Sequence, residues 1–149
     1  MSVLTPLLRT RALTDFFSDE QTVQGMLDFE AALATAQAQC GVIPTAAMNP
    51  IIAACRAENL DFQALANAAV NAGNLAIPLV KQLTQRVKND DVEASRYVHW
   101  GATSQDAIDT GRVLQLRQAL VETDIRLQRV MQVLAQQVER HRQTLMPGR

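Results

Sequence analysis

Residues 99–112, with the sequence HWGATSQDAIDTGR, gather small polar groups at the start of the longest predicted helix of the chain. Thr103 and Ser104 occupy positions typical of a helix N-cap, and Gln105 adds a side-chain amide beside them. The first backbone N–H groups of a helix have no partners inside it, and the helix dipole makes that end electropositive. These donors and the nearby His99 predict a pocket for an anion such as a substrate carboxylate.

A purely structural interpretation of the same segment stays open. Thr103 and Asp106 have the spacing of a capping box, which also stabilises helices that bind nothing. His99 and Trp100, however, are not needed to start a helix, and Gly101 would let a ligand approach the backbone closely. These extra features favour a binding role.

Several other polar residues are interpreted as structural. Asp109, like Asp106, is favoured in the first turn of a helix, whereas a carboxylate facing a substrate carboxylate would repel it. His141 falls in the last turn of the same predicted helix, where an imidazolium suits the dipole. Cys40 and Cys55 lack the spacing of a metal site, and two buried free thiols are favoured over a disulfide.

Helical periodicity predicts the elements that would position this segment. Ser18 and Gln21 have capping-box spacing and open a helix over about 19–40, which Gly41 ends. Shorter helices are expected after an Asn49 cap with Pro50 as the first residue, from an Asp61 cap to about Gly73, and over 77–90 with Pro78 in the first turn. Residues 89–102 are expected to form a loop with one helical turn.

The last predicted helix runs from about Ser104 to Thr144 and carries two apolar strips. These are Val113, Leu116, Leu120, Leu127, Met131, Leu134 and Val138, and Leu114, Val121, Ile125 and Val130. A helix of this length spans about 60 Å, so the short helices before it cannot cover both strips. Other long helices, from this chain or from copies of it, are expected beside it. Because Pro147 and Gly148 break this helix and nothing follows, the sequence is expected to be the first part of something longer.

Composition narrows the classes of function. The 149 residues are 48% apolar, which is enough for one folded core. The net charge is −1 and no basic block is present, which argues against nucleic acid or an anionic membrane as a partner. No signal peptide and no apolar run of about 20 residues is evident, so a cytoplasmic protein without a metal or cofactor is expected.

The chain resembles the fumarase/aspartase superfamily. HWGATSQDAIDT, residues 99–110, is similar to the H-x-G-x-T-S-x-D-x-x-D-T segment of that superfamily at fixed spacing. Residues 26–44, MLDFEAALATAQAQCGVIP, are similar to a segment near its N-terminus, and TLMPGR at 144–149 resembles the approach to its second conserved region. The resemblance implies an all-α fold, with an N-terminal helical domain over 1–100 and the start of a central long-helix bundle over 101–149.

Within the superfamily the chain looks most similar to the 3-carboxy-cis,cis-muconate cycloisomerases. Adenylosuccinate lyases carry a His-Asp pair where this chain has Asn74 and Leu75, and they usually lack an equivalent of Trp100. The resemblance implies closure of a muconate tricarboxylate to 4-carboxymuconolactone in protocatechuate breakdown, through an aci-carboxylate intermediate. An adenylosuccinate-lyase-like eliminase and a helical oligomerisation module without chemistry remain alternatives.

The resemblance also implies roles for particular residues. Thr103 and Ser104, with Gln105 beside them, would hold a substrate carboxylate, and His99 would contact substrate or orient a neighbour as the catalytic candidate. The remaining substrate-binding candidates are Asn74, Trp100 and Arg11, with Arg9 close behind Arg11. The superfamily's general-base serine lies in a later region, and its sites are shared between subunits of a homotetramer. This segment alone is therefore predicted to be inactive.

Overall fold

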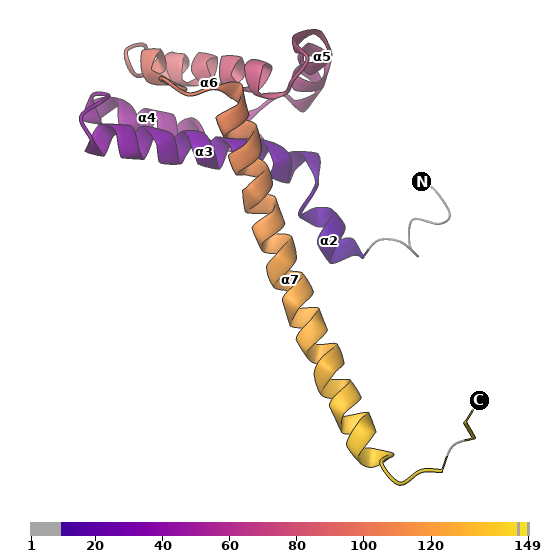
Figure 1. The fold of residues 1–149 in the computed structure, drawn as a ribbon. Coiled ribbons are helices and arrows are strands. Elements are labelled where there is room, and N and C mark those ends of the chain that lie inside the picture. The colour runs from indigo at the N-terminus through magenta and orange to yellow at the C-terminus, as the bar shows by residue number, and fades with distance from the viewer. Residues whose placement is uncertain (1–9, 146, 149) are drawn as a thin grey trace.

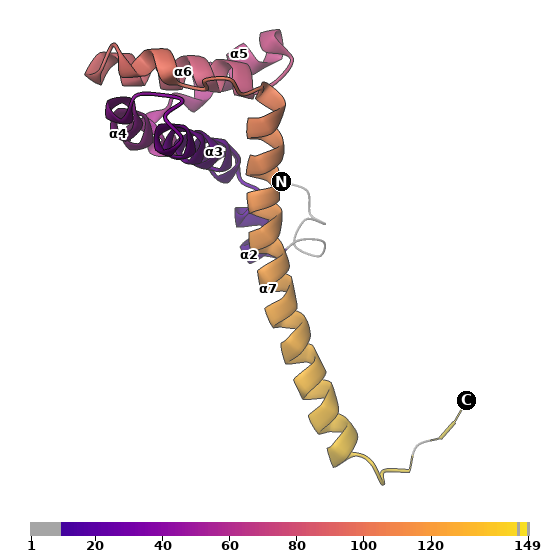
Figure 2. The same ribbon diagram turned by 60° about the vertical axis from the view of Figure 1, so that its left-hand side comes forward.

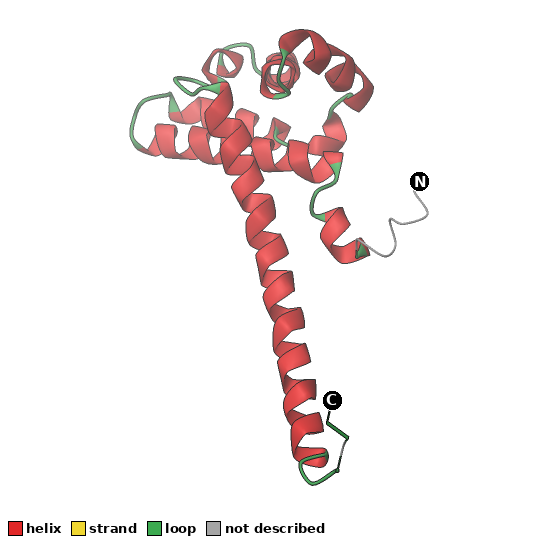
Figure 3. Cartoon of the chain, turned by 45° about the vertical axis from the view of Figure 1, so that its right-hand side comes forward, coloured by secondary structure: helices red, strands yellow, loops and turns green. Residues whose placement is uncertain are grey.

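The computed structural model describes residues 10–145, 147 and 148, and these residues form helices and loops but no strand (Figure 3). The all-α fold class expected from the sequence is therefore confirmed. In chain order the elements are α2 (Arg11–Asp15), α3 (Asp19–Gln39), α4 (Thr45–Ala54), the 3-10 turn η1 (Ala57–Asn59), α5 (Phe62–Ala72), α6 (Ala76–Asp90), the 3-10 turn η2 (Ala94–Tyr97) and α7 (Ser104–Arg140).

Helices α3 to α6 form a head from which α7 projects, and α2 lies outside the layers of this head (Figure 1). Helices α3 and α4 lie side by side, α5 and α6 form a second layer, and α7 crosses α3 and continues far beyond the head (Figure 2). The core lies between these layers, where Leu27 of α3, Ile51 of α4 and Leu83 of α6 are almost fully buried. This core fixes α3 and α6, the two helices on which the beginning of α7 packs.

Caps predicted from the sequence begin α3 and α5 and end α5. The Ser18 hydroxyl accepts a hydrogen bond from the Gln21 N–H at 3.2 Å at the start of α3. The reciprocal half of the predicted capping box does not form, because the Ser18 N–H donates to the Asp15 carbonyl at 3.3 Å. Asp61 caps α5 in the same way through the Ala64 N–H at 2.9 Å. Gly73 ends α5 with a φ of 72°, a left-handed conformation that favours glycine. The turn η2 is the helical turn expected in the loop before α7.

The start of α4 differs from the prediction. Asn49 and Pro50, expected as its cap and first residue, lie inside the helix, which begins at Thr45. Ala47 and Ile51 are four residues apart on the buried face of α4, which packs on α3. Burial of this additional turn outweighs the single backbone hydrogen bond that Pro50 is unable to donate.

Only the first part of α7 packs against the head. Its buried residues recur every fourth position, at Ala107, Gly111, Gln115 and Ala119. Beyond them the predicted apolar strips are exposed, including Leu120, Val121, Ile125, Leu127, Val130, Met131, Leu134 and Val138. The prediction that the preceding helices do not cover both strips is therefore confirmed. Although α7 is long, no helix of the described residues has an apolar stretch sufficient to span a bilayer.

The C-terminal end of α7 comes earlier than predicted. The helix ends at Arg140, with His141 as its C-cap, and not at Thr144. The Thr144 N–H donates to the His141 carbonyl at 3.0 Å, which forms a turn that leaves the helix. His141 accordingly lies just after the last turn, where its Nδ1 is 3.3 Å from the Thr144 hydroxyl.

Candidate substrate-binding site

The N-terminus of α7 is built by a reciprocal capping box, as predicted. The Asp106 N–H donates to Thr103 Oγ1 at 3.4 Å, and the Thr103 N–H donates to Asp106 Oδ2 at 2.8 Å. The Thr103 hydroxyl also donates to Asp106 Oδ2, at 2.9 Å. The backbone bond from Thr103, and then its hydroxyl bond, lower the pKa of Asp106. The Thr103 hydroxyl proton is therefore already engaged, although its oxygen still accepts.

Ser104 and Gln105 differ in the availability of their polar groups. Ser104 is half-buried, and its hydroxyl makes no hydrogen bond with the residues that the structure describes. Gln105 is exposed, and its side-chain N–H donates to Asp109 Oδ1 at 2.6 Å. Of the three polar residues that begin α7, Ser104 thus has the hydroxyl that is free to meet a ligand.

His99 is held by a buried glutamate of α3. Its Nδ1 lies 2.6 Å from Glu30 Oε1, and Glu30 is 1% exposed. Burial raises the pKa of Glu30, while the hydrogen bond and the charge of His99 oppose that rise. His99 has a φ of 58°, a left-handed conformation that is rare outside glycine. The Ala102 N–H donates to the His99 carbonyl at 3.4 Å, which forms the turn that leads from His99 to the start of α7.

Trp100 is fixed by its backbone and by a neighbouring ring. The Gln37 side chain donates to the Trp100 carbonyl oxygen at 2.6 Å, which ties the loop to α3. The indole ring is tilted by 56° against Tyr97, with the ring centroids 5.8 Å apart, and the residue is 49% exposed. Trp100 therefore presents an exposed ring beside the start of α7.

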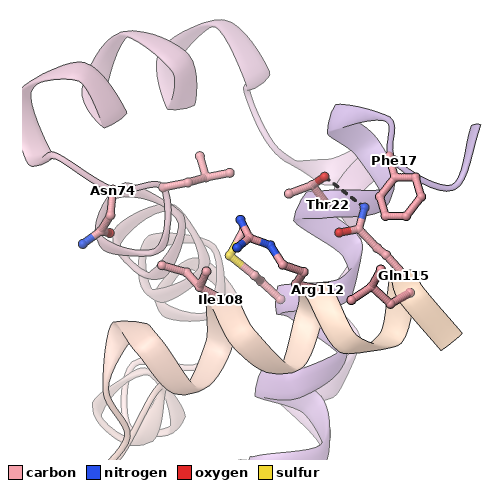
Figure 4. Close-up of a pocket in the computed structure, with 9 residues that line it drawn as sticks. Phe17, Thr22, Asn74, Ile108, Arg112 and Gln115 are labelled. Atoms are coloured by element: carbon pink, nitrogen blue, oxygen red, sulfur yellow. Dashed lines mark hydrogen bonds between the residues drawn. The ribbon is translucent and has the colours of Figure 1, made fainter. Parts of the chain in front are cut away.

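A pocket of about 530 Å³ lies between α3, the start of α6 and the second to fourth turns of α7. In Figure 4, Asn74 and Ile108 lie at one end, Gln115 and Phe17 lie at the other, and the Arg112 guanidinium points between them. Gln115 is locked by donating to the Phe16 carbonyl at 2.9 Å and to the Thr22 hydroxyl at 3.0 Å. The lining residues are Phe17, Thr22, Met26, Asn74, Leu75, Ile108, Arg112, Gln115 and Leu116.

The polar groups of this pocket suit an anion with an apolar body. Asn74 Oδ1 accepts from the Ile77 N–H at 3.1 Å at the start of α6, which leaves its amide N–H groups as donors. Arg112 forms no ion pair with the described residues. Around these two groups the lining is mostly aliphatic and aromatic. A carboxylate would find an amide donor and a guanidinium here, with apolar surface between them.

The structure brings some of the predicted site residues together. Thr103, Ser104 and Gln105 are contiguous at the start of α7, His99 lies in the loop directly before them, and Asn74 borders the adjoining pocket. Arg11 is exposed in α2 and does not line that pocket. Arg9 lies outside the described residues.

Sequence reasoning missed Glu30 and Arg112. Glu30 recurs at helical spacing among apolar residues of α3, and a charge on a buried face was the available signal. Arg112 lies two turns after Ser104 and lines the pocket together with Asn74 and Leu75, which directly precede α6.

A sequence model for a family described as Lyase matches residues 8–149. The chain belongs to this lyase family. A relative in the family, 3-carboxy-cis,cis-muconate cycloisomerase of Pseudomonas aeruginosa, is 60% identical over 133 residues, which cover 89% of this chain and 29% of that protein. The protein of the same name from Bradyrhizobium diazoefficiens is 52% identical over 147 residues, which cover 99% of this chain and 33% of the relative.

Solved structures of the lyase family agree with this assignment. The crystal structure of β-carboxy-cis,cis-muconate cycloisomerase from Acinetobacter calcoaceticus matches 99% of this chain and 35% of that chain, with 45% identity and a TM-score of 0.95. The resemblance to the fumarase/aspartase superfamily is thereby confirmed. The chain spans about a third of the length of these relatives.

Proposed function

We propose that this chain is part of a cycloisomerase that closes 3-carboxy-cis,cis-muconate to 4-carboxymuconolactone. The observation that carries the proposal is the 60% identity to a relative of that name, which extends over 89% of the chain. The free hydroxyl of Ser104 at the start of α7, and the adjoining pocket with Asn74 and Arg112, provide donors for a polycarboxylate.

The reaction is an isomerisation in which no atom is lost. One carboxylate oxygen of the substrate adds to a carbon of the diene and closes the ring, while a proton is delivered to the carbon next to a carboxylate. Negative charge develops on that carboxylate as an aci-carboxylate intermediate before the proton arrives. Preorganised donors that face the developing charge would supply the largest part of the rate enhancement.

The described residues divide this task between two places. The Ser104 hydroxyl and the unpartnered N–H groups that begin α7 bind one carboxylate, with the Gln105 amide, the Thr103 oxygen and the Trp100 ring at its edge. In the pocket, Arg112 binds a second carboxylate, and Asn74 provides a donor to the substrate on the other side of the apolar lining. His99 contacts the reacting end of the substrate. Arg11 would bind substrate only if another part of the full-length assembly placed the substrate next to α2.

The exposed apolar strips of α7 support a proposal about assembly. We assign residues 1–100 to an N-terminal helical unit and 101–149 to the start of a long-helix bundle in a homotetramer. The exposed apolar residues from Leu120 to Val138 would pack against other long helices there. Light scattering of the full-length protein would give the mass of a tetramer, and a monomer would contradict this assignment.

The function is tested by turnover of the full-length protein on 3-carboxy-cis,cis-muconate, followed by loss of the diene absorbance. Ser104→Ala should lower kcat/KM by about 100-fold or more with the fold intact, because a donor to the developing charge is lost. Asp61→Ala is the control, because it removes the side chain that caps α5, and Asp61 does not line the pocket. It should cost about 1 kcal/mol of stability and leave kcat/KM unchanged.

Two outcomes would favour the alternatives. Elimination of fumarate from adenylosuccinate, without lactone formation, would indicate an eliminase. Equal and small effects of Ser104→Ala and Asp61→Ala on stability, with no turnover of either substrate, would indicate a helical oligomerisation module.

A further inference from the structure

Glu30 and His99 each have an unfavourable feature: one is a buried carboxylate, and the other has a left-handed backbone conformation. Glu30 is the charged member of an otherwise apolar buried face of α3, which includes Val23, Leu27 and Ala34. His99 adopts a left-handed backbone conformation with a φ of 58°. Such a conformation in a non-glycine residue costs about 1–3 kcal/mol and persists only where the surroundings enforce it.

The carboxylate of Glu30 has one hydrogen-bond partner among the described residues. Its Oε1 lies 2.6 Å from His99 Nδ1, while its Oε2 is buried without a partner. A buried carboxylate with an unsatisfied oxygen is destabilising, and an apolar residue would serve the core of α3 better. Violations of this kind in an otherwise consistent fold mark residues kept for function.

The geometry fixes which nitrogen of His99 is available. Because Nδ1 is directed at Glu30, a neutral imidazole carries its proton on Nδ1 and has a free lone pair on Nε2. The Nε2 atom makes no hydrogen bond with the described residues, and the side chain remains 15% exposed. The imidazole therefore has one nitrogen anchored in the core and one that is neither buried nor bonded, on a residue in the loop directly before α7.

We infer that Glu30 is a positioning residue that holds His99 by Nδ1 so that Nε2 meets the substrate bound at the start of α7. The catalytic part of this inference rests on the proposed function. Glu30 itself does not touch substrate, because it lies in the core behind the imidazole. Its carboxylate sets both the direction of the ring and the nitrogen that carries the proton, as partners of functional histidines commonly do.

A double-mutant cycle in the full-length protein separates positioning from packing. Glu30→Met fills the same space without an acceptor, and His99→Gln removes the imidazole. Glu30→Met should lower kcat by about 10- to 100-fold with KM within about threefold, as for other residues that orient a functional histidine. In the His99→Gln background it should have no further effect on kcat, because it acts through His99. Additive losses of kcat in the cycle would overturn the inference.

The tautomer of His99 gives a second measurement that does not depend on turnover. In NMR spectra of protein with ¹⁵N-labelled histidine, the resonances of His99 are identified as those that are missing from the spectrum of His99→Gln. The neutral wild-type ring should carry its proton on Nδ1, and Glu30→Met should move that proton to Nε2. An unchanged tautomer would overturn the inference, as would a changed tautomer with unchanged kcat. Absence of cycloisomerase turnover in the wild-type protein would contradict the proposed function. The tautomer measurement would still test whether Glu30 orients His99 through Nδ1.

Discussion

Gly25 of α3 and Gly111 of α7 contact each other through their backbones where the two helices cross. A Cβ atom added at Gly25 would lie 2.9 Å from the Gly111 carbonyl oxygen, and one added at Gly111 would lie 2.9 Å from the Met26 nitrogen. Both neighbours are backbone atoms that are unable to rotate away. This crossing sets the position of α7 on the head, and with it the distance between the start of α7 and Glu30.

Gly111→Ala should therefore push the two helices apart. Overpacking of this kind costs about 1–3 kcal/mol, even though alanine is better than glycine by about 1 kcal/mol inside a helix. Urea unfolding of the full-length protein would measure the loss of stability. Gly25→Ala should cause a similar loss, whereas Gln118→Ala, at an exposed position of α7, should cause none. Unchanged stability in both glycine variants would show that the crossing tolerates a wider separation.

The capping box of α7 should contribute stability that depends on pH. Thr103→Ala should cost about 1 kcal/mol at neutral pH. Because the pKa of Asp106 is lowered from 3.8, its contribution is fully present above pH 3.8 and is lost as the pH falls through its value in the folded protein. The stability difference between wild type and Asp106→Asn should therefore shrink from pH 7 to pH 3. A difference that is constant across this range in urea unfolding would contradict the role of the charged carboxylate.

Local signals in the sequence were sufficient for most of the helices. Ser18, Asp61 and Thr103 cap helices as predicted, because an N-cap depends on residues within three positions along the chain. The helix start predicted at Asn49 failed for the opposite reason. The start of α4 depends on burial of Ala47 against α3, which outweighs the local preference of Pro50 for the first turn of a helix.

The candidate site was only partly predictable because its key contacts join distant residues. The pair of Glu30 and His99 spans 69 positions in the chain, and its distance depends on how α3 packs against the loop before α7. The backbone contact between Gly25 and Gly111 depends in the same way on the crossing of two helices. Arg112 has no local pattern that distinguishes it from other arginines of α7, and its role follows only from the position of α6.

The two cysteines should differ sharply in reactivity. Both cysteines are free thiols, as predicted, but the prediction that both are buried was wrong for Cys40. Cys40 is exposed as the C-cap of α3, whereas Cys55 is buried. Burial, and then the negative charges of Glu30 and Asp28, raise the pKa of the Cys55 thiol to about 12. At pH 8 a thiol reagent such as DTNB should modify one cysteine of the folded 149-residue chain and both cysteines in urea.

The same thiol predicts a loss of stability in alkali. Because the pKa of Cys55 is raised from 9.0 to about 12, its contribution is fully present below pH 9 and is lost as the pH rises toward 12. Cys55→Ala should remove this part of the alkaline limb, while Cys40→Ser should leave the limb unchanged. In the DTNB experiment described above, rapid reaction of both cysteines in the folded protein at pH 8 would contradict the burial of Cys55.

Arg112 should contribute binding energy for the charged substrate. Arg112→Met keeps much of the apolar side chain that lines the pocket and removes the guanidinium charge. We expect KM for the tricarboxylate to rise by about tenfold, which corresponds to about 1.4 kcal/mol, with a smaller change in kcat. Steady-state kinetics of the full-length protein at several salt concentrations would measure both constants.

Arg126→Met provides the matched control for the loss of one positive charge on α7. Arg126 pairs with Glu122 at 2.7 Å, away from the pocket, so its removal should leave KM unchanged. Because Arg112 acts by its charge, added salt should raise KM more steeply in wild type than in Arg112→Met. Equal KM values for the two variants, with equal salt dependence, would show that the guanidinium of Arg112 does not meet a substrate carboxylate and that the pocket beside Asn74 binds the substrate through other groups.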